Sequence, residues 1–255
     1  MAVSANTSVR RATVLIGLVV ALLGAFAASA SAVVNGSPDN GRHPYVGVAV
    51  WFAPSGGREV CSGSLVSATV FVTAAHCFQD GAEIFVDTQE DGYADVQLAG
   101  HGSAARGVAH VAPQSVGDVA VVKLAGDGLP QLDDRYAQLP APGFDDTLAN
   151  NQAVEIVGYG LQSLSPPVLG TRLTAPAKIV PGGGVTGDAF LKISSSEGLG
   201  GATCRGDSGG PDLQAGTDVM LAISSYGPSA TCKAVAYSQR MDTAGALGFV
   251  SGYRG

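Results

Sequence analysis

Short apolar runs, separated by turn residues, dominate the chain from Pro44 onward. The runs are rich in β-branched and aromatic residues, and Gly, Pro, Asp and Ser stand between them. Representative runs cover residues 45–52, 70–73, 119–122, 153–157 and 220–223. Such short runs favour strands over helices. The pattern predicts an all-β protein built as a sandwich or a barrel.

Two segments depart from this pattern. Residues 125–151 contain Gly, Pro, Asp and Gln without periodicity, and we interpret them as a crossing between two halves of the chain. Residues 242–251 are the only modest helix candidate.

The N-terminus has the pattern of a secretory signal peptide. Two arginines precede an apolar run over residues 12–28, and an Ala-x-Ala site ends at Ala32. The run is short for a retained membrane anchor, which is the rival interpretation. We expect residues 1–32 to be removed on export by the general secretory route. Twin-arginine export and cleavage after Ala30 are the alternatives.

Charge limits the partners of the exported chain. The whole sequence has 14 Lys and Arg against 21 Asp and Glu. Loss of the signal peptide removes two arginines and no acid, which takes the net charge from −7 to −9. An acidic chain disfavours polyanions. We therefore expect no nucleic-acid partner and no stable membrane anchor after signal removal.

The four cysteines are Cys61, Cys77, Cys204 and Cys232. An even number in an exported chain suggests two disulfides. The simplest choice pairs Cys61 with Cys77 and Cys204 with Cys232, but spacing alone leaves all three possible pairings open. A zinc site is the competing interpretation, and no Cys-x-x-Cys pair supports it. We expect no metal and no cofactor.

Residues 87–95 form an acidic stretch. Its acids and Gly92 stand at spacings near those of a calcium loop, but Leu98 occupies the place of the bidentate glutamate. We interpret the stretch as a solvated acidic turn and leave calcium binding open.

Three short segments carry reactive side chains. His76 follows Thr-Ala-Ala, Asp118 stands between Gly117 and an apolar run, and Ser208 lies in Gly-Asp-Ser-Gly-Gly-Pro. A serine hydroxyl is a weak nucleophile unless a neighbouring base takes its proton, and histidine suits that task. A carboxylate then orients the imidazole and stabilises its charged form. Glycines allow backbone amides, here those of Gly206 and Ser208, to bind an oxyanion.

These segments resemble the signature blocks of the chymotrypsin-like serine peptidase family, in that family's order along the chain. The resemblance extends to Val33-Val34-Asn35-Gly36, similar to the family's mature N-terminus, and to the Gly-Tyr-Gly at 158–160. It covers nearly all of residues 33–255 and looks closest to secreted bacterial members. It also favours Asp118 over three other aspartates that lie between His76 and Ser208, namely Asp87, Asp91 and Asp95.

The resemblance implies a fold and a disulfide pattern. We expect two six-stranded antiparallel Greek-key β-barrels, over residues 33–135 and 136–255, with the active site between them and a short C-terminal helix. The resemblance implies that Cys61 pairs with Cys77 beside His76, and that Cys204 pairs with Cys232 across the specificity pocket.

The resemblance also implies a function. We expect a secreted serine endopeptidase that acts as a monomer on peptides or proteins and is open to protein inhibitors. A non-catalytic binding protein on the same scaffold and an esterase are the alternatives. In this family the freed amino group of the first mature residue, here Val33, pairs with the residue that corresponds to Asp207. Signal cleavage after Ala32 would create that terminus directly.

The pocket residues suggest a substrate class by the same resemblance. Ala202 would lie at the base of the specificity pocket, followed by Thr203. Without a charge there, a basic P1 side chain would be desolvated without compensation, so we expect apolar P1 residues.

The walls of the pocket carry further residues. Ser225, Tyr226 and Gly227 resemble the segment that pairs with the substrate backbone, and Gly227 would leave the pocket mouth open. Val235 or Ala236 would narrow the opposite wall.

Overall fold

The structure is a computed structural model of the whole chain. It describes residues 33–34, 36–54, 56–78, 83–97, 106–113, 117–180, 185–186, 189–194, 203–227, 231–232 and 235–254. The expected signal peptide and Ala202 lie outside these residues.

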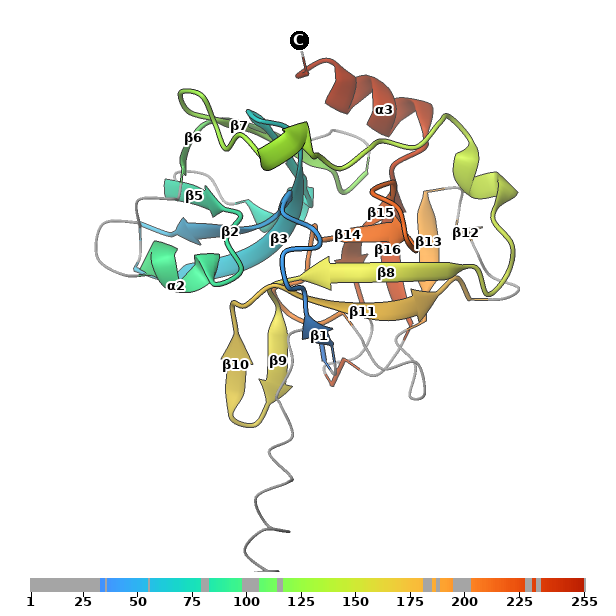
Figure 1. Cartoon of the computed structure of the whole chain (residues 1–255), viewed down its shortest axis with the longest axis horizontal. Helices are drawn as coiled ribbons and strands as arrows, with labels where there is room; N and C mark the ends of the chain where they lie inside the picture. Colours follow the sequence, from blue (N-terminus) through green and yellow to red (C-terminus); the bar gives the residue numbers. More distant parts are fainter. Residues whose placement is uncertain are drawn as a thin grey trace, which may run out of the picture. The chain divides into compact units, whose positions relative to one another are not determined.

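The first half of the chain forms a closed barrel of six antiparallel strands (Figure 1). The strands run in the order β2-β3-β4-β7-β6-β5 around the barrel. Their bounds are Val46–Phe52 for β2, Arg58–Ser67 for β3, Val70–Thr73 for β4, Glu83–Asp87 for β5, Arg106–Pro113 for β6 and Ala120–Leu124 for β7. Phe71 is fully buried, and its ring passes so close to Gly63 that a Cβ there would lie 2.4 Å away. Glycine at position 63 therefore makes room for the largest core side chain of β4.

The second half forms an eight-stranded antiparallel sheet in the order β1-β11-β8-β14-β15-β16-β13-β12. The bounds are Ser37–Pro38 for β1, Ala153–Gly158 for β8, Leu173–Lys178 for β11, Val185–Thr186 for β12, Phe190–Ile193 for β13, Pro211–Gln214 for β14, Met220–Tyr226 for β15 and Ala236–Arg240 for β16. A bridge between Ile179 and Ile193 joins the end of β11 to β13. The six strands from β11 to β13 therefore curl back on themselves. A hairpin of β9 (Leu161–Leu164) and β10 (Pro167–Leu169) stands apart from this sheet. The predicted all-β fold is confirmed.

The helices are short. The predicted C-terminal helix is α3 (Ala244–Ser251), which begins where Thr243 Oγ1 accepts a hydrogen bond from the amide of Ala246 at 3.2 Å. The sequence pattern missed α2 (Gly92–Gln97) because a helix of six residues is too short to show a helical period. The solvated-turn interpretation was wrong for Asp87, which ends β5 and is buried. No helix in the described ranges has the length and hydropathy to span a bilayer.

Each end of the described chain packs against the opposite half. Strand β1 pairs with β11 of the second sheet, although the sequence placed residues 33–135 in the first barrel. Helix α3 shares one apolar cluster with the first barrel, and Lys123 Nζ of β7 donates to the carbonyl of Tyr253 at 3.0 Å. The same cluster contains Tyr159 and Met241 from the second half. The two halves are therefore held against each other by a shared core.

Candidate active site

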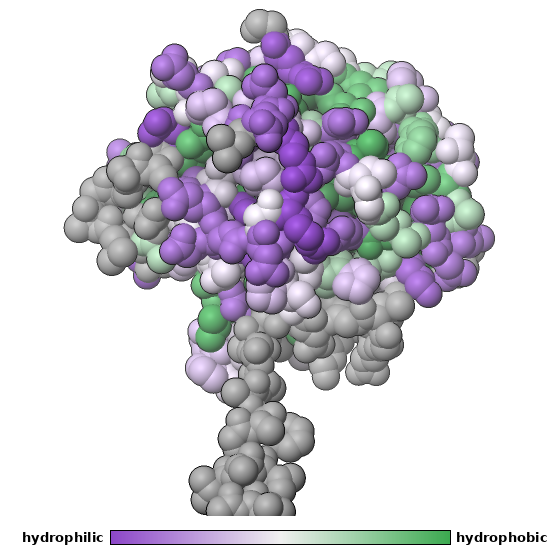
Figure 2. Space-filling view, in the orientation of Figure 1, coloured by the Kyte–Doolittle hydropathy of each residue, from purple (hydrophilic) through white to green (hydrophobic). Residues whose placement is uncertain are grey.

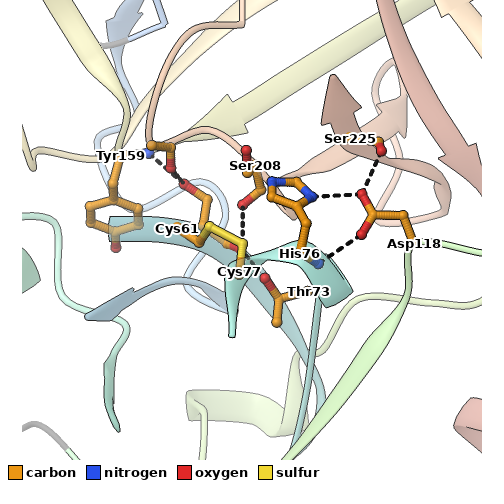
Figure 3. The surroundings of a disulfide bond; sticks show 10 residues. Cys61, Thr73, His76, Cys77, Asp118, Tyr159, Ser208 and Ser225 are labelled. Atoms are coloured by element: carbon orange, nitrogen blue, oxygen red, sulfur yellow. Dashed lines mark hydrogen bonds and ion pairs between the residues drawn. A yellow bond between two sulfur atoms is a disulfide. The ribbon is translucent and has the colours of Figure 1, made fainter. Parts of the chain in front are cut away.

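His76 and Asp118 meet at one end of the first barrel. His76 lies in the 3₁₀ turn Ala75–Cys77 that follows β4, and Asp118 precedes β7, the strand paired with β4. His76 Nδ1 is 2.7 Å from Asp118 Oδ2, and the His76 amide donates to Asp118 Oδ1 at 2.9 Å (Figure 3). Both oxygens of the carboxylate thus orient one histidine. The disulfide Cys61–Cys77 ties the turn to β3, as the resemblance implied.

The pair has the electrostatics of a catalytic base and its orienting group. Burial alone would raise the pKa of the Asp118 carboxyl, but hydrogen bonds from His76 and Ser225 outweigh it and hold the pKa below its usual range. The hydrogen bond to Asp118 raises the pKa of His76, with burial opposing it. Nδ1 is occupied, so Nε2 is the ring nitrogen left to exchange a proton.

Ser208 reaches the pair from the second sheet, in the loop before β14. Ser208 and His76 line the same cavity, and Figure 3 shows the serine beside the imidazole ring. Among the described residues, Ser208 and His76 make no hydrogen bond with each other, as is common before a substrate binds. The structure therefore brings the three predicted residues to one place.

The nucleophile loop contains backbone amides that donate to no group among the described residues. Gly206 has φ +95° and Gly209 has φ +79°, backbone conformations that favour glycine. The amides of Asp207, Gly209 and Gly210 all donate within the protein. The amides of Gly206 and Ser208 donate to no group in the described part of the chain, so both are available to an oxyanion.

Ser62 holds the nucleophile loop from the first barrel. Its amide donates to the Ser208 carbonyl at 2.9 Å, and its hydroxyl donates to the Gly206 carbonyl at 2.8 Å. The same hydroxyl accepts from the amide of Tyr159 at 2.9 Å. Ser62 was not predicted, because a serine beside a cysteine carries no signal of a partner 144 residues away in the chain.

Gln239 supports Asp118 from the second sheet. Its Oε1 accepts from the Asp118 amide at 3.0 Å, and its Nε2 donates to the carbonyl of Ala189 at 2.9 Å. A Cβ on Gly117 would lie 3.0 Å from the same Oε1, so the glycine lets the amide side chain approach. Gln239 was not predicted from the sequence either.

Asp207 is buried, and no cation among the described residues pairs with it. Its carboxylate accepts hydrogen bonds from the amides of Gly160 at 2.9 Å and Cys204 at 2.8 Å. Burial raises the pKa of Asp207 to about 7, although these amides oppose the rise. Val33 is also buried, but it packs in the apolar cluster of the second sheet. Among the described residues the structure does not bring Val33 and Asp207 together, and Val33 still follows residue 32 through a peptide bond.

The predicted specificity pocket is a cavity of about 330 Å³ beside Ser208. Its lining includes Thr203, Ser224, Ser225, Tyr226, Gly227, Ala236 and the disulfide Cys204–Cys232. Of the two candidates for the opposite wall, Ala236 lines the cavity and Val235 does not.

Ser208 also lines a second cavity, of about 420 Å³. Its walls include Trp51, Arg58, Glu59, His76, Leu161 and Arg205. Ser208 therefore borders two cavities, as a nucleophile that attacks the middle of an extended chain would.

Two antiparallel β units, with a serine, a histidine and an aspartate at their junction, define a class of double-barrel hydrolases. The family model described as Trypsin matches residues 33–242, and the chain belongs to this family. The family and the fold support a serine protease.

Solved structures share the fold. An HL collagenase has a TM-score of 0.66 at 20% sequence identity, with 82% of this chain and 94% of that chain covered. Human heparin-binding protein has a TM-score of 0.64 at 15% identity, with 86% and 96% covered. At these identities the likeness concerns the fold alone. No curated protein matches the chain.

Proposed function

We propose that the chain is a secreted serine endopeptidase that cleaves peptide bonds through an acyl-enzyme on Ser208. The observation that carries the proposal is the hydrogen-bonded His76–Asp118 pair beside Ser208, with two free amides in the same loop. Two disulfides are typical of exported proteins, and so few of them suits the bacterial members that the sequence resembles.

The mechanism follows from these positions. His76 Nε2 takes the proton of Ser208 Oγ as the oxygen attacks the substrate carbonyl carbon. The amides of Gly206 and Ser208 donate to the oxyanion that forms. When the tetrahedral intermediate collapses, the amine leaves with the proton from His76 and the acyl-enzyme remains. Water then attacks the acyl-enzyme while His76 takes its proton. Collapse of this second intermediate releases the acid and returns the proton to Ser208. Asp118 stays ionised and stabilises the imidazolium.

Protein or peptide chains suit the cleft. Ser225 and Tyr226 end β15 and Gly227 follows it, and an extended substrate can add there as a further strand. Tyr226 is 51% exposed and stacks on Tyr237 with ring centroids 4.7 Å apart, which offers an apolar platform. We propose apolar P1 residues, with Ala202 at the pocket base.

Activation would follow from signal cleavage. Removal of residues 1–32 would free the amino group of Val33. This group could supply the cation that the buried Asp207 lacks in the described part of the chain. Such a pair is favourable only with good geometry, but leaving one carboxylate buried alone is costly.

The surface suits a monomer that does not bind polyanions. Figure 2 shows mostly hydrophilic residues on the face it presents, with apolar ones between them. Val168 and Tyr226 are the exposed large apolar residues in the described part of the chain. One structural neighbour is a heparin-binding protein. The whole chain has a net charge of −7, which disfavours binding of a polyanion such as heparin.

A comparison of the secreted chain with Ser208→Ala on a peptide library tests the proposal. We expect hydrolysis by the first, and a fall in kcat of about 10⁶-fold in the second. A fluorophosphonate probe should label the first and not the second. Hydrolysis of equal rate by Ser208→Ala would overturn the proposal.

A further inference from the structure

His43 is a buried histidine that the mechanism does not use. It lies in the loop between β1 and β2 and is 5% exposed. It lines a cavity of about 300 Å³ together with Arg42, Arg135, Glu155 and Asp218. The lining of this cavity shares no residue with the two cavities at Ser208, so its charged side chains need a role of their own.

Asp39 determines which ring nitrogen of His43 can bind a ligand. Its Oδ1 is 2.5 Å from His43 Nδ1, and its Oδ2 accepts from the His43 amide at 3.0 Å and from Arg172 Nε at 2.9 Å. Burial would raise the pKa of Asp39, but the hydrogen bonds from His43 and the charge of Arg172 outweigh it and lower the pKa to about 2. The ionised carboxylate holds the proton on Nδ1, so Nε2 keeps its lone pair. A carboxylate behind the other ring nitrogen is typical of metal-binding histidines.

Glu155 of β8 places a carboxylate oxygen near this lone pair. Its Oε2 is 3.8 Å from His43 Nε2, which is too long for a hydrogen bond. Neither atom has a hydrogen-bond partner among the described residues. The other oxygen, Oε1, fixes the side chain, because it accepts from Thr174 Oγ1 at 2.7 Å and lies 2.7 Å from Arg42 Nη2. Two acceptors that lie this close together suit a cation bound to both.

We infer that His43 Nε2 and Glu155 Oε2 bind a divalent transition metal ion, with Zn²⁺ as the best fit. Zinc accepts imidazole and carboxylate ligands at about 2.0–2.2 Å, so a tetrahedral ion needs donor atoms about 3.4 Å apart. A shift of about 0.4 Å brings the observed 3.8 Å to that distance. From the sequence no metal is expected, because the two ligands lie far apart in the chain.

The other charged side chains of the cavity limit the affinity. Asp218 already accepts from Tyr45 Oη at 2.8 Å and from Arg135 at 3.0 Å, so water would complete the coordination. Arg42 repels the ion, but its side chain is 52% exposed and its guanidinium contacts Oε1, which leaves Oε2 to the metal. The site should therefore bind less tightly than a structural zinc site with four protein ligands.

A metal ion at this position would join two parts of the second half of the molecule. His43 follows β1, which pairs with β11, and Glu155 lies in β8 on the other side of β11. The ion would therefore fasten the N-terminal segment to the sheet and stabilise the folded chain. Neither the site nor its test depends on the proposed function.

The test uses the exported chain with Ser208→Ala and His76→Ala, which cannot digest itself and lacks the exposed imidazole of His76 as a competing ligand. Calorimetric titration with Zn²⁺ should show one ion bound per chain. Mg²⁺ at the same concentrations should not bind, because it prefers oxygen ligands alone. The midpoint of thermal unfolding should rise by about 5–10 °C at a Zn²⁺ concentration of about 100 times the dissociation constant.

Three further variants in this background locate the ion. Glu155→Gln removes one ligand and should weaken binding at least about tenfold. Arg42→Gln keeps both ligands and removes a positive charge, so it should tighten binding about threefold or more. Replacement of His101 and His110, the remaining histidines, by alanine is the control and should change nothing.

Two results would overturn the inference. One is the absence of Zn²⁺ binding up to about 1 mM, a concentration at which even the weaker protein metal sites are occupied. The other is an affinity that is equal in the background protein, Glu155→Gln and Arg42→Gln, which would place the ion elsewhere. If Glu155→Gln failed to fold, Arg42→Gln would still decide, because Arg42 is exposed and an unchanged affinity in that variant would exclude His43 and Glu155 as the ligands.

Discussion

At the scale of single residues, the site depends on which ring nitrogen of His76 is occupied. Asp118 takes Nδ1 with one carboxylate oxygen and the His76 amide with the other, which fixes both tautomer and ring orientation. Ser225 donates to the same carboxylate. The carboxylate is therefore held from three sides and stays ionised beside the base.

Asp118→Asn should lower kcat by about 10⁴-fold, because an amide favours the wrong histidine tautomer. kcat/KM requires neutral His76, so it falls as the pH drops through the histidine pKa. Asp118 raises that pKa above its usual 6.5, and the variant should move the acid limb of the profile to lower pH. Rates across a pH series check both effects, with the exposed Asp91→Asn as the control. An unchanged acid limb would show that Asp118 does not act on His76.

Ser62→Ala should weaken the nucleophile loop without touching the reacting atoms. It removes hydrogen bonds to the Gly206 carbonyl and from the Tyr159 amide, each worth about 1 kcal/mol. We expect a fall in kcat of about tenfold or more, with KM little changed. Ser64→Ala on the same strand is the matched control, because the buried Ser64 hydroxyl has no partner in the described chain. Equal kinetics in the two variants would contradict the role given to Ser62.

At the scale of elements, β16 of the second sheet supports the loop before β7 of the first barrel. Gln239 makes this link through the amide of Asp118. Gln239→Ala should lower kcat about tenfold with KM unchanged, and should shift the acid limb, because a looser Asp118 holds His76 less firmly. Gln214→Ala, on β14, is the control. A loss of thermal stability with normal kinetics would mean that Gln239 is structural only.

The elements also show how far the sequence could lead. Runs of β-branched residues between turn residues predicted the all-β fold, and residues 242–251 were the helix candidate that corresponds to α3. The reactive residue types in three short motifs, and their order along the chain, predicted His76, Asp118 and Ser208. Ser62 and Gln239 were missed because each acts across strands on residues far away in the chain. The pairing of β1 with β11 was missed for the same reason: two residues carry no pattern of their own, and the partner strand decides where they lie.

At the scale of the whole molecule, the start of the mature chain should set both activity and pH stability. Asp207 has a pKa of about 7, above its usual 3.8, in the intact chain. A group whose pKa rises on folding stabilises the protein at low pH, and that stability is lost as the pH rises through the folded pKa. A form that begins at Ser31 should therefore become less stable between about pH 5 and about pH 8, by on the order of 3 kcal/mol.

A form that begins at Val33 should lose less stability over the same range, because its amino group pairs with ionised Asp207 and lowers the pKa of that carboxyl. Thermal unfolding of both forms as Ser208→Ala proteins, which cannot digest themselves, measures the difference. Burial also raises the pKa of Asp212 to about 7, but Asp212 titrates alike in both forms, so its contribution cancels. With Ser208 present, the Val33 form should be at least about 100-fold more active, because a pair between its amino group and Asp207 would hold the nucleophile loop, with the Gly206 and Ser208 amides, more firmly. Equal activity and equal pH dependence of the two forms would remove Val33 from the activation of this protease.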